Sequence, residues 1–327
     1  MIKEEDIRKR DSLARYLELV AADCTRLLSA HQLAVVACPA CEGEDSTFEF
    51  RKQGFEYHTC LSCQTLFART RPDFHSLEEF YTHSEATTYW INEFFKPVAE
   101  ARRQKIFVPR AEYVANRFGN DPAWCIGDIG AGFGIFCDEL RRLWPKSSYI
   151  AIEPSPEQAE ICRNSGIEVI QKPVEAIEDS AKRFDFLTAF EILEHLHSPR
   201  RFVTIVRELL KPGGWLLLTS LNGLGFDIQV LWERSKNVYP PCHINFLNPH
   251  SLSQMLEGIG FRVHTVETPG QLDWDIVQGA IEHHDAQPER FWKVVAQRVG
   301  PAGKQGLQKW IRENSLSSHM RVLAQRI

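Results

Sequence analysis

The sequence predicts an α/β fold in which helices cover both faces of a sheet, preceded by a small cysteine-rich module. Two observations lead to this prediction. From Trp124 onward, short apolar runs alternate with helical patterns, which is typical of a parallel sheet with helices on both faces. Between residues 35 and 71, two Cys-x-x-Cys pairs occur in a stretch too small to be stabilised by a core of its own.

The composition is that of an ordinary globular protein. Of the 327 residues, 43% are hydrophobic and 25% are charged, and this length accommodates one large domain with a smaller module. The net charge of −5 disfavours a nucleic-acid partner, since such proteins usually carry a basic face. The sequence has neither a signal peptide nor an apolar run approaching the roughly 18 residues of a membrane span. We therefore expect a cytoplasmic protein with no membrane partner, and the oligomeric state stays open.

The segments that precede the α/β part are predicted as follows. Residues 1–34 form an N-terminal helical segment, because apolar residues recur there at three- and four-residue steps. Residues 35–71 form the cysteine-rich module. Residues 72–104 form a helical linker or lid that is rich in aromatic residues, and the stretch "ATTYW" at 86–90 is the part that could close over a ligand.

The cysteine-rich module has the spacing of a zinc site. Two Cys-x-x-Cys turns, separated by a polar turn and two short β-like runs, direct four thiolates to one point and suit tetrahedral Zn²⁺. The four predicted ligands are Cys38, Cys41, Cys60 and Cys63. Four sulfur ligands leave no open coordination position, so the zinc is expected to be structural. Redox-active or free cysteine pairs are the alternative.

Seven strands are expected in the α/β part, with helical patterns between the first five and a helical insertion at 271–313. The expected strands are Trp124–Ile129, Tyr149–Ile152, Glu168–Ile170, Phe184–Phe190, Trp215–Ser220, Phe261–Glu267 and Met320–Ala324.

A glycine-rich loop, "IGDIGAGFGIF" at 126–136, follows the first of these strands, where a doubly wound sheet binds its ligand. A phosphate-binding Walker loop is excluded because no Gly-Lys-Ser/Thr follows, and the glycines run G-x-G-x-G rather than in the dinucleotide pattern. Asp128 at the mouth of the loop would repel a pyrophosphate but suits a ligand with a positive charge.

The second strand ends in Glu153, about 25 residues later, where an acid usually accepts hydrogen bonds from both hydroxyls of an adenosine ribose. A cationic ligand that carries adenosine but no phosphate is S-adenosylmethionine. We therefore predict S-adenosylmethionine as the cofactor.

Four motifs resemble those of the class I S-adenosylmethionine-dependent methyltransferases and occur in the same order along the chain. They are the D-x-G-x-G-x-G loop, the acidic end of the second strand, "FDFLTAFEILEHL" and "LLKPGGWLLLTSLN". The resemblance covers residues 105–327 and implies a Rossmann-like sheet of seven strands. The stretches "LNGLGFD", "PPCHINFLNPHSL", "TPGQLDWDIV" and "SSHMRVLA" resemble a bacterial subgroup that carries an N-terminal zinc ribbon and often acts in polysaccharide or secondary-metabolite pathways.

The resemblance implies a set of residues that contact the cofactor or face the substrate. These are Asp128, Gly130 and Gly132 at the methionine part, Glu153 at the ribose, Pro154 beside the adenine, Val174 and Glu175 at the adenine edge, Phe190 and Glu191 at the sulfonium and substrate, and His195 of the "EH" pair. A helix-start residue satisfied by backbone is the alternative interpretation of the Glu194-His195 pair.

His243 is the candidate general base. It lies in an irregular "YPPCHIN" segment after the fifth strand. This segment resembles the "HEH…YF" stretch of zinc-containing sugar C-methyltransferases, but it contains only one of the two histidines of that stretch. Histidine suits proton transfer because its unperturbed pKa lies near ~6.5. A structural role in pinning the segment is the alternative.

These residues predict a methyltransferase that acts on a small molecule, a sugar or a secondary metabolite, by O- or C-methylation. Two alternatives remain open. One is an RNA methyltransferase that binds nucleic acid through its zinc module. The other is a catalytically idle fold that docks a partner protein through the ribbon and the helical insertion.

Overall fold

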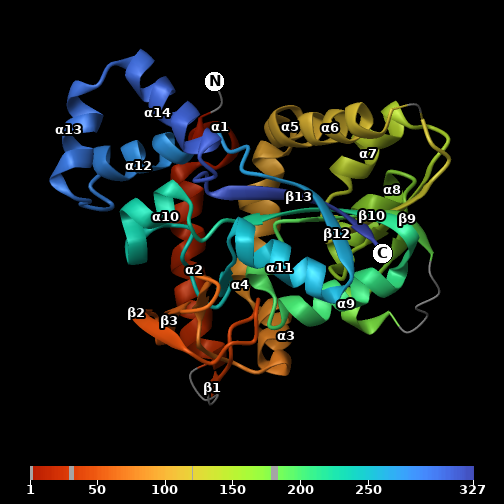
Figure 1. Cartoon of the computed structure of the whole chain (residues 1–327), viewed down its shortest axis with the longest axis horizontal. Coiled ribbons are helices and arrows are strands. Elements are labelled where there is room, and N and C mark those ends of the chain that lie inside the picture. Colours follow the sequence, from red (N-terminus) through yellow and green to blue (C-terminus); the bar gives the residue numbers. More distant parts are fainter. Residues whose placement is uncertain (1–2, 29–32, 120, 178–182) are drawn as a thin grey trace.

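The computed structural model describes residues 3–28, 33–119, 121–177 and 183–327, which fold around one large sheet (Figure 1). Residues 1–2 and 29–32 of the predicted N-terminal helical segment lie outside the described residues. Among those described, no helix combines the length and the apolar character that crossing a bilayer requires. The boundaries predicted for the four segments of the chain stay predictions.

The large sheet has the seven predicted strands. In spatial order they are β12 (Phe261–Glu267), β13 (His319–Arg326), β10 (Leu210–Leu221), β9 (Phe184–Phe190), β6 (Cys125–Ile129), β7 (Ser148–Ile152) and β8 (Glu168–Ile170). From β10 to β8 all neighbours are parallel, whereas β13 runs antiparallel to both β10 and β12. The predicted parallel sheet is therefore confirmed from β10 to β8, and β13 is an antiparallel strand inserted between β10 and β12. After β12, at the edge of the sheet, the chain turns back without crossing to the opposite edge. β13 therefore runs antiparallel to β12 and takes the place between β12 and β10.

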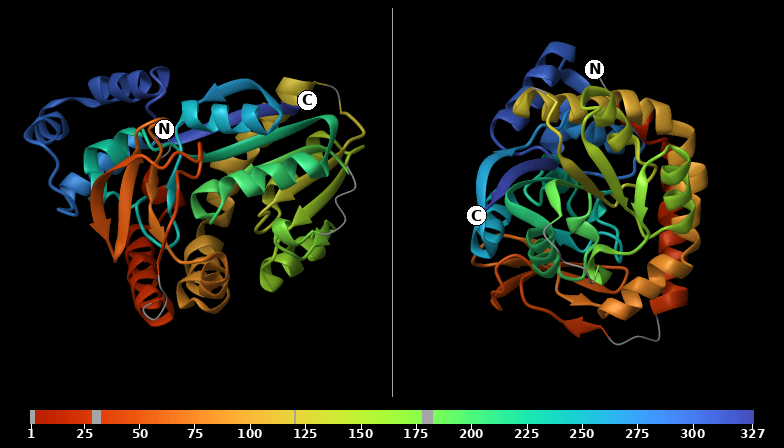
Figure 2. Two further views of the ribbon diagram at one scale, coloured as in Figure 1. Left: turned by 60° about the horizontal axis from the view of Figure 1, so that its bottom comes forward. Right: turned by 90° about the vertical axis from the view of Figure 1, so that its right-hand side faces the viewer.

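Helices cover both faces of this sheet, as predicted (Figure 2). On one face α6 (Val108–Phe118), α7 (Ile135–Leu143) and α8 (Pro156–Asn164) share a core with the sheet. On the other face lie α9 (Pro199–Leu209) and α11 (Pro249–Ile259). Successive side chains of a strand point to opposite faces of the sheet, so on β10 Leu217 belongs to the first core, and Leu216 and Leu218 belong to the second.

Strand β6 lies at the switch point of the sheet. The chain proceeds from β6 to β7 and β8 on one side, then crosses back to place β9 on the other side of β6. Loops that leave adjacent parallel strands in opposite directions open a crevice at their carboxyl ends, which is where α/β sheets bind ligands. The glycine-rich loop follows β6 at this point.

The boundary between the fourth helix and the fifth strand differs most from the prediction. The sequence places the end of the fourth helix at Pro212-Gly213-Gly214, but α9 ends at Leu209 and β10 begins at once at Leu210. The pairing of β10 with β9 shifts register between Leu210 and Trp215, so the Pro-Gly-Gly stretch forms an irregularity within the strand. Gly213, with φ of +75°, adopts the left-handed conformation that such an irregularity requires.

The cysteine-rich module forms a second sheet whose fourth strand comes from far along the chain. Strands β2 (Ser46–Lys52), β3 (Phe55–Cys60) and β4 (Leu66–Ala68) are joined by β11 (Asn245–Phe246), which pairs with β4. Two short strands, β1 (Ala34–Val35) and β5 (Thr70–Arg71), pair beside it. The module is thus built into the rest of the protein.

Helices of the N-terminal third pack around this module. The predicted first helix is two helices, α1 (Glu4–Ile7) and α2 (Arg10–Leu28), because Arg8 adopts extended backbone angles between them. The helical elements that follow the ribbon are α3 (Phe74–His83), α4 (Glu85–Tyr89), η1 (Trp90–Phe95), η2 (Lys96–Val98), α5 (Ala99–Arg102) and η3 (Arg103–Phe107), which leads into α6. Their aromatic residues mostly enter a common core with the ribbon.

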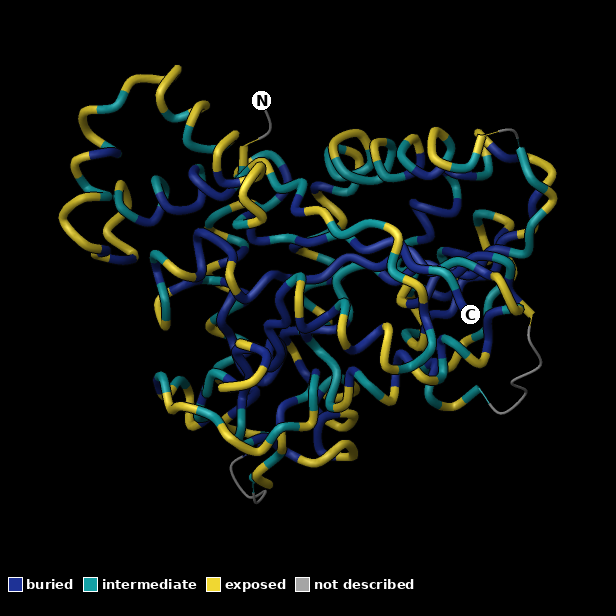
Figure 3. Tube along the Cα trace, viewed as in Figure 1, coloured by how far each residue is buried: buried dark blue, intermediate teal, exposed yellow. Residues whose placement is uncertain are grey.

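The predicted helical insertion contains α12 (Asp273–Glu282), α13 (Arg290–Arg298) and α14 (Pro301–Glu313). Together with α10 (Phe226–Leu231) these helices form a small core of their own. Figure 3 shows that α13 and α14 lie at one end of the molecule, and much of their length is exposed.

Candidate active site

The loop after β6 is shaped by glycines in the left-handed region. Gly130 and Gly132 have φ of +65° and +57°, which residues with a Cβ adopt only at a cost. A Cβ on Gly130 would lie 2.8 Å from Ile192 Cδ1, so this glycine is also required by space. The loop therefore presents bare backbone at the carboxyl end of β6.

Asp128 lies beneath this loop and is buried. Thr188 Oγ1, on β9, donates a hydrogen bond to Asp128 Oδ1 at 2.6 Å. Burial raises the pKa of Asp128 to about 7, because the low-dielectric surroundings disfavour the charged form. A cationic group placed beside it would restore the ionised carboxylate.

Glu153 follows β7 directly and is also buried. Its Oε2 accepts a hydrogen bond from the backbone N–H of Gly132 at 2.8 Å, and its Oε1 accepts one from the N–H of Ser155 at 2.9 Å. The carboxylate thus ties the glycine loop to the end of the second strand. Each oxygen keeps a further lone pair for another donor.

The three residues predicted beside an adenine lie at the same edge of the sheet. Pro154 follows Glu153, and Val174 and Glu175 belong to η4 (Val174–Ala176), the turn after β8. Val174 is buried in the core beneath α9, and burial raises the pKa of Glu175. Since β7 and β8 are parallel, these positions share one edge with the glycine loop.

Phe190 and Glu191 end β9 and meet an arginine from α6. The Arg110 guanidinium lies 4.5 Å from the centre of the Phe190 ring. Its Nη2 donates to Glu191 Oε1 at 2.8 Å, and Thr219 Oγ1 donates to the same oxygen at 2.7 Å. Glu191 has φ of +55°, a strained value for a non-glycine residue that is often found at functional sites.

The second oxygen of Glu191 lacks a hydrogen bond. Oε2 is buried and has no hydrogen-bond partner among the described residues, although His319 Nε2 lies 3.5 Å away. Burial alone would raise the pKa of Glu191, but the charges of His319 and Arg110 outweigh it and hold this pKa below its usual value. A buried, ionised oxygen without a donor is suited to receive one from a ligand.

Sequence reasoning missed Arg110. Its signal is weak, because one basic residue near the start of an amphipathic helix usually faces solvent. The neighbouring inward positions, Ala111 and Val114, are fully buried, which places Arg110 at the margin of the buried face. Only the position of α6 against β9 and β10 shows that its guanidinium points inward.

His195 lies in η5 (Leu193–His195), the turn after β9, and is partly exposed. The Tyr81 hydroxyl donates to the carbonyl oxygen of Cys242 at 3.4 Å and lies 3.3 Å from His195 Nδ1. When the Tyr81 hydroxyl donates its one proton to Cys242, Nδ1 donates to Tyr81 and Nε2 is left unprotonated; when it donates to Nδ1 instead, Nε2 carries the proton. Burial lowers the pKa of His195 to about 4, so the ring is neutral at neutral pH.

His243 lies against His195 but is more deeply buried. The two ring centres are 4.7 Å apart. His243 Nδ1 lies 2.7 Å from the carbonyl oxygen of Asn237, to which it must donate, and Nε2 accepts from the Tyr239 hydroxyl at 2.8 Å. Both nitrogens are therefore engaged, and burial holds the pKa of His243 well below its usual value. Its role as general base stays a prediction.

Glu194 lies between these histidines and the sheet. Ser220 Oγ donates to Glu194 Oε2 at 2.9 Å, and burial raises the pKa of Glu194 to about 8. Ligand atoms of Glu194, His195 and His243 lie within 4.8 Å of one another, a spacing that a metal ion could bridge. The hydrogen bonds on His243 would first have to break.

The four predicted zinc ligands converge in the ribbon. Cys38 Sγ and Cys63 Sγ are 3.5 Å apart, as are Cys41 Sγ and Cys60 Sγ, and all four sulfur atoms lie within 4.8 Å of one another. A regular tetrahedron with Zn–S bonds of about 2.3 Å has sulfur–sulfur edges of about 3.8 Å. The cluster therefore fits a tetrahedral zinc ion.

The ribbon also holds the segment that carries His243. The Tyr57 hydroxyl, on β3, donates to the carbonyl oxygen of His243 at 2.7 Å. Asn248 Nδ2 donates to the carbonyl oxygen of Cys63 at 2.8 Å, so a cysteine of the cluster is bound directly to this segment. The ribbon is therefore connected to the histidine side of the site.

Comparison with known proteins agrees with this architecture. A family model described as a methyltransferase domain matches residues 99–266, just over half of the chain. A ubiquinone biosynthesis O-methyltransferase of Xanthomonas axonopodis pv. citri (strain 306) is 32% identical over 211 residues, covering 57% of this chain and 86% of the relative. The mitochondrial ubiquinone biosynthesis O-methyltransferase of Homo sapiens is 30% identical over 155 residues, and the match spans 42% of its length.

A solved structure shows the same fold. One chain of the complex between the Haloferax volcanii Trm112 methyltransferase activator and a methyltransferase superposes with a TM-score of 0.50 at 13% identity, covering 72% of this chain and 96% of that one. The glycine loop and the parallel strands from β10 to β8 lie within the matched residues. The chain belongs to the S-adenosylmethionine-dependent methyltransferases.

Proposed function

We propose that this protein transfers a methyl group to a hydroxyl oxygen of a small molecule, with a hydroxylated aromatic secondary metabolite as the preferred acceptor class. The names of the relatives support O-methylation. S-adenosylmethionine supplies an electrophilic methyl group whose leaving thioether needs no acid. The residues of the chain therefore have two tasks, which are to orient the partners and to take up the acceptor's proton.

Charged groups at the carboxyl ends of β6 and β9 suit the methionine part of the cofactor. Asp128 and the buried Oε2 of Glu191 can accept hydrogen bonds from an ammonium group. Arg110, which donates to Glu191, can pair with a carboxylate. An arrangement of two acids and one arginine is complementary to an amino acid, and it disfavours a polyphosphate.

Because Asp128 has a raised pKa, cofactor affinity is expected to depend on pH. Its pKa is about 7, so the carboxylate is mostly neutral at pH ~6 and mostly ionised at pH ~8. Affinity should therefore rise by up to about tenfold between these values, since only the ionised form attracts the cofactor's ammonium group. Isothermal calorimetry across this range measures the change. In the Asp128→Asn variant the affinity should be low and should lack this rise. A wild-type affinity that is flat or falls with pH would contradict the role.

Glu153→Ala is expected to weaken S-adenosylmethionine binding by about tenfold to several hundredfold. The variant loses two charge-assisted hydrogen bonds to the ribose, each typically about 1.5–3 kcal/mol, and the bond that holds Gly132. Calorimetry on the purified variant tests this. Glu157→Ala is the matched control, because Glu157 lies on α8 close by but is exposed and paired with Lys96. Equal affinity in wild type and Glu153→Ala would show that the ribose is bound elsewhere.

The acceptor side is built around His195. Its Nε2 is unprotonated when the Tyr81 hydroxyl donates to Cys242, and its side chain is partly exposed. The partly exposed His195 ring, whose Nδ1 lies 3.3 Å from the Tyr81 hydroxyl, is the single observation on which the proposed acceptor chemistry rests. We assign proton uptake to Nε2 of His195, with His243 packed against the ring to orient it.

Aromatic side chains around these histidines favour a planar acceptor. Tyr16 of α2 contacts Trp90 of η1 and Tyr239, with ring centres 4.9 and 5.8 Å apart, and Tyr239 contacts His243 at 4.0 Å. Aromatic rings pack on planar rings at little entropic cost. A sugar, which the sequence leaves open as an acceptor, needs more polar partners than these rings provide.

The experiment that tests the proposal is transfer of a tritiated methyl group from S-adenosylmethionine. Purified protein is offered separate pools of phenols and catechols, nucleotide sugars, and RNA. The proposal expects label in the phenolic pool, at hydroxyl oxygens. Label in the sugar pool or in RNA, with none in the phenols, would overturn it.

A further inference from the structure

The two helices α13 and α14 form a hairpin, residues 290–313, that the methyltransferase chemistry does not use. They lie beyond the sheet at one end of the molecule (Figures 1 and 2). Their inner side packs on α10 and α12 through Val295 and Ile311. The rest of the hairpin is largely exposed.

This hairpin carries a charge opposite to that of the whole chain. It contains one acidic residue, Glu313, and six basic ones, Arg290, Lys293, Arg298, Lys304, Lys309 and Arg312, for a net charge of +5. The whole chain has a net charge of −5. Among the described residues only Lys309 has a carboxylate partner, Glu313 at 3.7 Å, so the other basic groups are not neutralised within the protein.

Large apolar side chains are exposed on the same hairpin. The side chains of Phe291, Val294 and Trp310 are 64%, 46% and 53% exposed. Phe291 and Val294 are three positions apart on α13 and therefore lie on one side of the helix. Trp292, between them in sequence, instead turns inward to Phe226, with ring centres 4.9 Å apart. The outward apolar side chains are thus exposed beside the hairpin core, which the Phe291 ring contacts through Trp292 at 4.9 Å between ring centres.

We propose that the hairpin docks the protein on the surface of a bilayer that contains anionic phospholipids. Helices with basic residues beside exposed Trp, Phe and other apolar residues lie in the membrane interface, where the basic groups meet anionic headgroups and the apolar side chains enter the acyl boundary. Val294 favours this occupant over RNA, because an aliphatic side chain does not stack on bases as an aromatic ring does. Peripheral docking of this kind needs no membrane-spanning helix, and the proposal departs from the expectation, drawn from the sequence, that the protein has no membrane partner.

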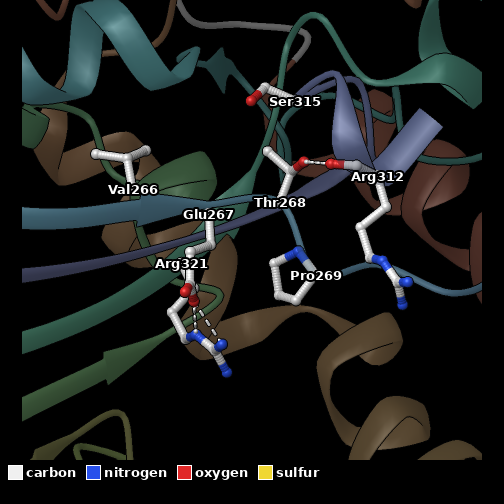
Figure 4. Close-up of a pocket in the computed structure, with 7 residues that line it drawn as sticks. All are labelled: Val266, Glu267, Thr268, Pro269, Arg312, Ser315 and Arg321. Carbon is white, nitrogen blue, oxygen red and sulfur yellow. Dashed lines mark hydrogen bonds and ion pairs between the residues drawn. The ribbon is translucent and has the colours of Figure 1, made fainter. Parts of the chain in front are cut away.

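The base of the hairpin is linked through Arg321 of β13 to the helix that supplies Arg110. Arg312 and Ser315, at and just after the end of α14, line a pocket with Thr268 and Arg321 (Figure 4). The Arg321 guanidinium lies 3.5 Å from the centre of the Tyr113 ring on α6, one turn after Arg110. A protein docked through the hairpin would therefore hold this side of the methyltransferase domain near the membrane surface.

Vesicle co-sedimentation of the full chain tests the proposal. One set of vesicles is pure phosphatidylcholine, and in the other about a third of the lipid is phosphatidylglycerol, which supplies the negative surface. Wild-type protein should sediment with the anionic vesicles at least about tenfold more strongly than with the neutral ones, and added salt should weaken the binding. Sedimentation with neither set, or equal sedimentation with both, overturns the proposal.

Two variants separate the charged and apolar contributions. Arg290→Glu/Arg298→Glu and Phe291→Ser/Trp310→Ser should each weaken binding to anionic vesicles by on the order of tenfold or more. The matched control is Phe48→Ser/Leu61→Ser on the ribbon, where the side chains are 53% and 58% exposed, and it should bind as wild type does. Unchanged S-adenosylmethionine affinity and melting temperature show that each variant is folded.

If the hairpin variants sediment like wild type, the hairpin is not the docking surface. If wild-type protein shifts RNA in a gel but ignores anionic vesicles, the basic surface belongs to nucleic acid and the proposal fails. Neither outcome depends on the acceptor proposed above, because no step of the assay involves methyl transfer.

Discussion

His195→Ala is expected to lower the turnover of methyl transfer by about 10²–10⁴, the usual contribution of a positioned general base. Cofactor affinity should stay near that of wild type, because the groups assigned to the methionine and the ribose do not depend on the imidazole. Steady-state rates with a labelled acceptor, together with calorimetry for S-adenosylmethionine, measure the two effects separately. Exogenous imidazole should restore part of the rate, since His195 is partly exposed.

The pH dependence has a defined direction. The pKa of His195 is about 4, so the ring is neutral and able to accept a proton at neutral pH. Wild-type turnover should fall as the pH drops toward this value, because protonation removes the base, and the residual rate of His195→Ala should lack that ionisation.

His243→Ala distinguishes the two histidines. The sequence places the base at His243, and in the structure both of its nitrogens are hydrogen-bonded. If it orients its segment, its loss should lower stability by about 1–2 kcal/mol and weaken acceptor binding, with the pH dependence unchanged. If His243→Ala removes the pH dependence and His195→Ala retains it, His243 is the base and the assignment made here is wrong.

Cys60→Ser is expected to abolish tight zinc binding and to unfold the ribbon. Structural zinc in small modules contributes an apparent ~10–16 kcal/mol, which is comparable with or larger than the whole stability of a typical domain. Purified wild-type protein should carry about one zinc per chain, bound by the four clustered cysteines. Elemental analysis and thermal melts measure both results, and Cys125→Ser, outside the cluster, is the control.

The same variant should affect the acceptor side more than the cofactor side. β11 pairs with β4, and Tyr57 and Asn248 connect the ribbon to the segment of His243. S-adenosylmethionine affinity should therefore remain largely intact while acceptor turnover falls. Fresh, reduced wild-type protein without zinc, or a Cys60→Ser variant that melts like wild type, would contradict the zinc assignment.

Much of the fold could be predicted because its signals are local. Phe184–Phe190 and Phe261–Glu267 are continuous apolar or alternating runs, and the structure has strands with the same bounds. The cysteines of the ribbon converge because each Cys-x-x-Cys turn fixes two sulfur atoms by itself. Short-range geometry of this kind can be predicted from the spacing of residues in the sequence.

The features that sequence reasoning missed depend on contacts between distant segments. β11 has two residues and becomes a strand only by pairing with the ribbon, and its Phe246 pairs with Leu66, 180 positions earlier in the sequence. Arg110 looks like any basic residue of an amphipathic helix until α6 is placed against Glu191. The hydrogen bonds that engage His243 arise from Asn237 and Tyr239, whose turn has no periodic pattern.

Isothermal calorimetry with four ligands tests the central claim most directly. Wild-type protein is titrated with S-adenosylmethionine, its demethylated product, NAD and ATP. We expect dissociation constants in the micromolar range for the first two and no measurable heat for NAD or ATP, because Asp128, Glu153 and Glu191 favour a cation and repel phosphates. Binding of NAD or ATP, with no heat from S-adenosylmethionine, would contradict it.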